Sequence, residues 1–229
     1  MLTSKPEKYA QDEFDAARID LGTSPPTEAL LRFYRRLDQA LSEAALTSDK
    51  KPACGPGCSY CCHYKVVARA VEVIAIQQYV VSRFSQTQIK TAIAQAAFNV
   101  NEAKDISHEE HLAINQPCPF LVDQKCSIYP VRPSKCRSFH ASDVEGCKRS
   151  FENPQDLTIQ NSYVWEVFEA GFGSSQGFDA AASDAGLDSR VYDLNSAFLE
   201  AMNNSGSAKR LKNKKKVFLG ARTETPLGE

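Results

Sequence analysis

Apolar residues return at helical spacing in several stretches of the chain, and polar or proline-rich segments separate these stretches. The first stretch follows Ser24, which suits the N-cap of a helix, and Pro25, which suits its first position. The pattern therefore predicts an amphipathic helix over residues 25–45. Its apolar face consists of Leu30, Phe33, Tyr34, Leu37, Leu41 and Ala45.

Two more helices are predicted to meet near Ser85. Residues 66–84 form the first of them, and apolar side chains cover so much of its surface that it should be largely buried. Ser85 and Gln88 have the spacing of a capping box, which marks the start of the second helix. The second helix continues at helical period through Ile89, Ile93, Ala97 and Val100.

The C-terminal half carries two further helical patterns. Residues 159–170 have helical period and place Trp165 in the core, and Gly171 and Gly173 are expected to end this helix. Residues 191–202 give a last helix of about three turns. Neither an internal repeat nor clear strand alternation is apparent. The fold class predicted is mainly α: a helical domain with an irregular Cys-rich loop region.

These patterns divide the chain into three parts. Residues 1–24 are predicted to be a polar N-terminal arm, residues 25–204 a single helical domain, and residues 205–229 a basic flexible tail. The cysteine motifs lie within the helical domain, at residues 54–150. The charges of the tail come from Lys209, Arg210, Lys212, Lys214, Lys215 and Lys216.

Composition indicates a soluble globular protein of 229 residues, with 42% hydrophobic and 24% charged residues. The net charge of −1 gives the molecule no general affinity for polyanions. Residues 1–21 contain no apolar run, so we expect no signal peptide. Charged residues interrupt the longest apolar stretch, residues 66–81, so we expect no membrane span. The expected location is the cytoplasm, where clustered cysteines are more often metal ligands than disulfides.

The cysteines are the most informative residues of the chain. All eight lie between residues 54 and 147, and four of them fall within residues 54–62. Cys58 and Cys61 have the two-residue separation that lets one turn of backbone present two sulfurs to one metal ion. The neighbouring side chains of Cys61 and Cys62 diverge, so Cys62 serves a second metal, belongs to a multi-iron cluster, or is a thiol beside the ligands.

A second group of cysteines follows about halfway along the chain. Cys118, Cys126 and Cys136 lie in a loop region that prolines stiffen, and Cys147 comes soon after. Arg132 and Arg137 flank Cys136. Because four thiolates on a divalent ion leave excess negative charge, we expect these two guanidinium groups to offset it beside the cofactor. We also expect Cys58, Cys61, Cys118, Cys126 and Cys136 to converge in space.

The ordered set of motifs resembles the YkgJ-type cysteine-cluster family, whose members are described as zinc- or iron-chelating domains. The motifs are Cys54-x3-Cys58-x2-Cys61-Cys62, Cys118-Pro-Phe-Leu, and Cys126-Ser-Ile-Tyr-x2-Arg132-Pro-x2-Cys136-Arg137. The resemblance covers about residues 54–150. It implies that the metal ligands are Cys54, Cys58, Cys61, Cys62, Cys118, Cys126, Cys136 and Cys147.

The four histidines carry weaker signals. His63 and His140 lie near cysteines in the sequence, but we interpret them as solvated residues or as neighbours of the ligands. His108 and His111 lack the spacing that places two imidazoles on one helical face, so a polar surface helix is the preferred interpretation. No catalytic acid–base pair is apparent, and we assign no catalytic residue.

The sequence therefore predicts a metal-binding protein that holds zinc or iron, with an iron–sulfur cluster as one form of the iron site. One alternative is an iron–sulfur enzyme that carries out redox or group-transfer chemistry. The other is a zinc-finger-like module that binds nucleic acid through the basic tail. We do not expect nucleic acid as the partner, because no stacking aromatic residues alternate with the lysines of the tail.

Overall fold

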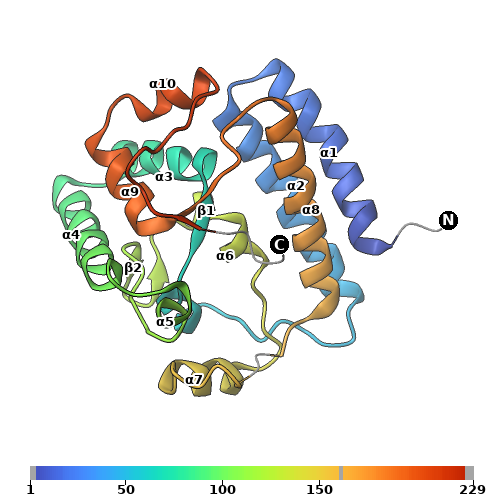
Figure 1. The fold of residues 1–229 in the computed structure, drawn as a ribbon. Coiled ribbons are helices and arrows are strands. Elements are labelled where there is room, and N and C mark those ends of the chain that lie inside the picture. Colours follow the sequence, from blue (N-terminus) through green and yellow to red (C-terminus); the bar gives the residue numbers. More distant parts are fainter. Residues whose placement is uncertain (1–3, 160–161, 225–229) are drawn as a thin grey trace.

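The computed structural model describes residues 4–159 and 162–224, and Figure 1 shows the mainly α-helical architecture that the sequence predicts. Short 3-10 helices and very short strands connect the longer helices. The 3-10 helices are η1 (Tyr60–His63) and η2 (Tyr129–Val131). The α-helices are α1 (Lys5–Thr23), α2 (Pro26–Thr47), α3 (Ala70–Arg83), α4 (Gln86–Ala103), α5 (His108–Leu112), α6 (Ser134–Ser138), α7 (Val144–Glu152), α8 (Trp165–Asp184), α9 (Leu194–Asn203) and α10 (Ser207–Lys212).

Two small antiparallel sheets accompany the helices. One has the strand order β1-β4-β5, with Ala68 opposite Tyr192 and Tyr192 opposite Thr223. The other is the hairpin β2-β3, whose turn residues Asp123 and Gln124 both have positive φ. Among the described residues no strand exceeds three residues, which is too short for an alternating pattern to be recognised in the sequence. The strands are β1 (Val67–Arg69), β2 (Leu121–Val122), β3 (Lys125–Cys126), β4 (Val191–Asp193) and β5 (Thr223–Glu224).

The helices form two groups that share one hydrophobic core. Helices α1, α2 and α8 lie together on one side of the molecule, whereas α3, α4 and α9 lie together on the other (Figure 1). Helix α2 has the predicted apolar face, and Leu30, Phe33 and Leu37 are almost fully buried in the core. The capping box of Ser85 and Gln88 is present at the start of α4, as predicted. No helix within the described ranges is both long and apolar enough to cross a membrane.

Most of the predicted polar N-terminal arm forms helix α1. Helix α1 packs along α8, and its buried acidic residues Glu13 and Asp20 are neutralised from α2. Arg36 donates to Glu13 at 2.7 Å and to Asp20 at 2.8 Å, and Arg32 donates to Asp20 at 2.8 Å. The polar composition of this segment therefore reflects pairing with a neighbouring helix, which sequence periodicity cannot reveal.

Helix α8 does not end at Gly171 or Gly173. It continues to Asp184. Two glycines of α8 lie where the backbone of α1 packs against it, and their lack of a side chain allows this close approach. A Cβ atom at Gly173 would collide with the backbone carbonyl of Pro6, and one at Gly177 with that of Ala10. Trp165 at the start of α8 is 64% exposed and is therefore not a core residue.

The C-terminal segment is folded through Glu224, in contrast to the flexible tail expected for residues 205–229. Its apolar residues Leu211, Val217 and Phe218 are buried, and the lysines between them face outward or are partly covered. The carboxylate of Glu200 accepts the backbone N–H groups of three consecutive residues in this segment. These hydrogen bonds join the segment to a side chain of α9, so they produce no periodic pattern of apolar residues in the sequence. Residues 225–229 of the predicted tail lie outside the described residues.

Candidate metal centre

The first four cysteines lie on a tight loop that leads into η1. The N–H of Cys58 donates to Gly55 O at 3.1 Å, and Gly57 has φ of 89°, a value that glycine adopts without strain. The loop then passes into η1, which contains Cys61 and Cys62. A 3-10 helix has three residues per turn, so neighbouring side chains leave it roughly 120° apart. The two adjacent thiols nevertheless stay in contact, because the Cys61 thiol is hydrogen-bonded to that of Cys62.

One group of thiols, here called the inner group, consists of Cys62, Cys118, Cys126 and Cys136. The N–H of Cys118 donates to the carbonyl of Cys62 at 2.8 Å, so these two segments lie side by side. The β2-β3 hairpin pairs Leu121 with Cys126, and α6 carries Cys136. Every pair within the inner group is close enough for the two charges to interact. The chain thus brings cysteines from four positions to one place.

The inner thiols are partly shielded from water, because all four cysteines are half-buried. Burial raises the pKa of Cys118 to about 12, and burial also raises the pKa of Cys136 and Cys126 above the usual thiol range. Cys62 behaves oppositely: a hydrogen bond with the Cys61 thiol lowers its pKa to about 7. A bound cation would stabilise all four thiolates, because metal binding favours the deprotonated form of a ligand.

The other cysteines form what we call the outer group: Cys54, Cys58 and Cys147, with Cys61 at its edge. The charge of Cys147 interacts with those of Cys54 and Cys58, and Cys54 also interacts with Cys61. Cys61 lies between the groups, since its charge interacts with Cys136 as well. The convergence of Cys58, Cys61, Cys118, Cys126 and Cys136 in one site stays a prediction: Cys61 neighbours the inner group, and Cys58 neighbours Cys54 and Cys147.

The two arginines predicted to offset thiolate charge have different surroundings. Arg132 interacts electrostatically with Cys62 and Cys126, and its guanidinium lies 3.7 Å from the centroid of the Tyr129 ring. Arg137 is almost fully buried and binds Asp38 through two hydrogen bonds of 2.7 and 2.8 Å. Its guanidinium also lies over the Tyr34 ring of α2 and donates to the carbonyls of Arg132 and Pro130. Arg132 is thus the closer charge for the thiols, and Arg137 mainly attaches the loop to α2.

The two arginines should respond differently to substitution. We expect Arg132→Ala to keep the fold and weaken metal retention about 10–100-fold, the range typical of residues that support metal ligands. We expect Arg137→Ala to lower the midpoint of urea unfolding, because Asp38 and two loop carbonyls lose their donor. Chelator competition and urea titration of both variants separate these effects. Equal metal retention in wild type and Arg132→Ala would contradict the assignment.

The histidines are engaged in packing and polar contacts. The ring of His63 lies 3.1 Å from the carbonyl of Ser59 through Nδ1 and packs on Phe151. His111 is buried, contrary to a surface helix, and contacts the Gln116 side chain at 3.0 Å. Within the described part of the chain, Nδ1 of His140 has no hydrogen-bond partner.

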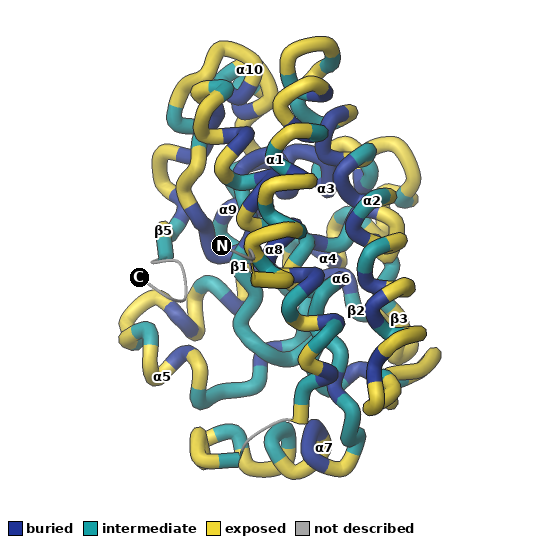
Figure 2. The backbone as a smooth tube through the Cα atoms, turned by 90° about the vertical axis from the view of Figure 1, so that its right-hand side faces the viewer, coloured by how far each residue is buried: buried dark blue, intermediate teal, exposed yellow. Residues whose placement is uncertain are grey.

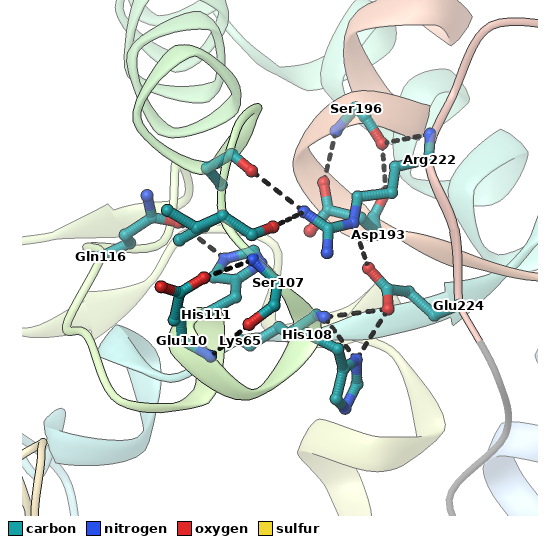
Figure 3. Close-up of polar contacts among 12 residues, drawn as sticks. Lys65, Ser107, His108, Glu110, His111, Gln116, Asp193, Ser196, Arg222 and Glu224 are labelled. Carbon is teal, nitrogen blue, oxygen red and sulfur yellow. Dashed lines mark hydrogen bonds and ion pairs between the residues drawn. The ribbon is translucent and has the colours of Figure 1, made fainter.

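A buried ion pair fixes the backbone that follows η1 (Figure 3). Lys65 Nζ lies 2.9 Å from the Glu224 carboxylate of β5, and both side chains are almost inaccessible to water. His108 Nδ1 contacts the same carboxylate oxygen at 2.9 Å, and Arg222 Nε contacts the other oxygen at 2.9 Å. Burial alone would raise the pKa of Glu224, but the hydrogen bonds from Lys65 and His108 lower it. The C-terminal strand therefore helps to hold the segment that carries Cys62.

All eight cysteines have free thiols. In the described ranges 4–159 and 162–224, no three Cys, His, Asp or Glu side chains are already arranged to enclose a metal ion. The thiols are near one another, so adjustment of side chains and of the flanking loops is needed before either group can close around an ion. The donor chemistry itself suits zinc or iron, since thiolates are preferred ligands of both zinc and iron–sulfur clusters.

Comparison with protein families gives one finding. Residues 53–162 match the model of the CxxCxxCC family, described as a "putative zinc- or iron-chelating domain". The match contains all eight cysteines and confirms the resemblance seen in their spacing. Comparisons with curated proteins and with solved structures give no match. The family description supports metal binding and leaves the metal and the role of the protein open.

Proposed function

We propose that this protein binds zinc or iron through the inner group, Cys62, Cys118, Cys126 and Cys136, and that the bound metal holds the loop region on the helical core. The observation that carries the proposal is the mutual proximity of these four thiols, which come from four separate positions of the chain. Four thiolates are the complete ligand set of a structural zinc site or of an iron–sulfur cluster.

The surroundings of the inner group suit such a site. All four thiols are half-buried, so a metal held there would be partly shielded from competing ligands in water. Arg132 supplies positive charge beside Cys62 and Cys126 and would offset part of the charge of four thiolates. Cys61 lies next to the inner group, because its thiol is hydrogen-bonded to that of Cys62.

The test is metal analysis of the full chain purified without oxygen, combined with its visible spectrum. We expect zinc or iron in stoichiometric amount, and visible absorbance if the iron is in a cluster. Cys136→Ser should remove the metal of the inner group. Lys135→Ala, an exposed neighbour on the same helix, is the matched control and should retain it. The full metal content in Cys136→Ser would exclude the inner group as the site.

A folded variant is needed for this test, because Cys136 is half-buried on a helix that packs against α8 and α2. The helical signal in far-UV circular dichroism reports on α2, α3 and α8, which lie outside the cysteine loops. If Cys136→Ser loses this signal, Cys126→Ser offers a less buried substitution in the same group. Loss of metal with the helical signal intact, in either variant, supports the proposal.

A further inference from the structure

We propose that the lysines of the C-terminal segment form a docking surface for a membrane that contains anionic lipids. The protein would lie on this membrane without crossing it. The docking surface, here called the lysine surface, lies on α10 and in the turn that follows it, and consists of Lys209, Lys212, Lys214, Lys215 and Lys216. It contains no cysteine, so this inference does not depend on the metal centre.

Positive charge is concentrated in this part of the chain. Residues 205–224 contain seven of the 27 basic residues of the protein and one of its 28 acidic residues. Four of the five lysines are exposed, and Lys216 is half-buried. Within residues 4–159 and 162–224, no carboxylate forms an ion pair with any of the five. A protein with a net charge of −1 therefore carries a local positive field that attracts an anionic surface.

The fold holds the lysine surface in one arrangement. The N–H groups of Lys214 and Lys215 donate to the carbonyls of Leu211 and Arg210, both at 3.0 Å. These two hydrogen bonds form the Schellman motif that ends α10. Arg210 Nε donates to the carbonyl of Lys216 at 2.6 Å. Because the backbone of the turn is already ordered, docking does not have to order it.

Lys214 occupies a position at which a side chain is unfavourable. Its φ is 55°, and this position of a Schellman motif is usually glycine, which has no Cβ to clash in the left-handed region. Strained backbone of this kind is concentrated at functional sites. Since Lys214 is exposed, its side chain adds charge to the lysine surface at a cost to the backbone.

An exposed apolar side chain lies close to these charges. Leu219 is 59% exposed, and it follows Lys216 by three residues, which an extended chain spans in about 10 Å. The two residues between them, Val217 and Phe218, are fully buried and anchor the segment in the core. The carboxylate of Glu200 accepts the N–H of Leu219 at 2.6 Å and so holds its backbone in place.

Lysines near an exposed leucine suit an anionic bilayer better than a nucleic acid. The ammonium groups pair with anionic headgroups, and the leucine side chain enters the apolar boundary below them. A nucleic acid would engage the lysines and leave Leu219 without a partner. The one aromatic residue of the segment 205–224, Phe218, is fully buried and cannot stack on bases.

The lysine surface is well separated from α7. In two perpendicular views, α10 lies at one end of the molecule and α7 at the other (Figures 1 and 2). A membrane docked on α10 therefore does not reach α7. Lys148 of α7 is exposed and provides a control charge for this reason.

The test is co-sedimentation of the full chain with vesicles of phosphatidylcholine and phosphatidylserine, compared with vesicles of phosphatidylcholine alone. We expect binding only to the anionic vesicles, and we expect added salt to weaken it, because salt screens exposed charges. Lys214→Gly should weaken binding roughly fivefold, the usual contribution of one lysine near an anionic surface. The same variant should raise the midpoint of urea unfolding, because glycine relieves the strain at this position.

Two further variants serve as comparisons. Lys148→Gln removes one positive charge from the opposite end of the molecule and should leave vesicle binding unchanged. Leu219→Ala removes apolar contact and no charge, so it should weaken vesicle binding while the dependence on salt stays the same.

Several results would overturn the inference. Equal binding to the two kinds of vesicle, or binding to neither, would do so. A folded Lys214→Gly variant that binds as tightly as the wild type would do so as well. Binding to a duplex oligonucleotide in place of the vesicles would assign the lysine surface to nucleic acid. Each of these results leaves the proposed metal site unaffected, because no cysteine is changed.

Discussion

Removal of the metal by a strong chelator under reducing conditions should loosen residues 115–150 before the helical core unfolds. This region consists of very short elements; α6, for example, has five residues, and isolated helices of that length are marginal in water. Structural zinc in small zinc-dependent domains contributes about 10–16 kcal/mol of apparent binding free energy at neutral pH. We therefore expect a large rise in protease cleavage and amide hydrogen exchange within this region.

The loosening should be uneven. Phe120 and Ile128 are fully buried in the main core, and the Phe120 ring meets that of Phe198 at 4.8 Å. These two anchors should keep residues 118–128 near the core after the metal is lost, so the rise in exchange should be greatest around Cys136 and α7. Helices α2 and α8 serve as internal controls. Unchanged protection over residues 115–150 after proven metal loss would show that packing alone orders the loops.

The helices with strong local signals could be predicted from the sequence. Helix α2 has a regular apolar stripe, and the start of α4 is marked by a capping box, Ser85 and Gln88, whose two hydrogen bonds involve residues only three apart. Interactions of this kind are encoded within one or two turns of the chain. They hold regardless of what packs against the helix, which is why the sequence alone indicates them correctly.

The parts that could not be predicted depend on distant partners. Gly173 looks like a helix end until the backbone of α1 is placed against it. The N-terminal segment looks like a solvated arm until Arg36 is placed between Glu13 and Asp20. In each case the residue type permits two structures, and only the tertiary neighbour decides between them.

The sequence indicates which cysteines are candidate ligands but not how they are grouped. Spacing alone indicates that Cys58 and Cys61 could share an ion, and it leaves three explanations for Cys62. The structure adds the 3-10 conformation of η1 and the hydrogen bond between Cys118 and Cys62, which place Cys62 with the later cysteines. Tyr64, whose hydroxyl reaches the carbonyl of Cys147, gave no signal at all, because a single tyrosine has no pattern to recognise.

Phe218→Ala should destabilise the protein by about 3–5 kcal/mol, the usual range for removing a buried aromatic side chain. Phe218 is fully buried, and its ring meets that of Tyr192 edge to face at 5.1 Å. Tyr192 is the central residue of the β1-β4-β5 sheet, so the cavity would open directly beside the strands. We expect a clear fall in the midpoint of urea unfolding, monitored by far-UV circular dichroism.

The matched control is Leu219→Ala, which removes the apolar side chain of the next residue. Leu219 is 59% exposed, and only its backbone N–H is engaged, by Glu200 at 2.6 Å, so this variant should change stability by less than about 0.5 kcal/mol. If both variants unfold with the wild-type midpoint, the C-terminal segment contributes no packing and the flexible tail predicted from its lysines is the better description. A loss confined to Phe218→Ala instead makes residues 207–224 part of the core, because the β5 strand and its Glu224 ion pair with Lys65 depend on the same placement of the chain.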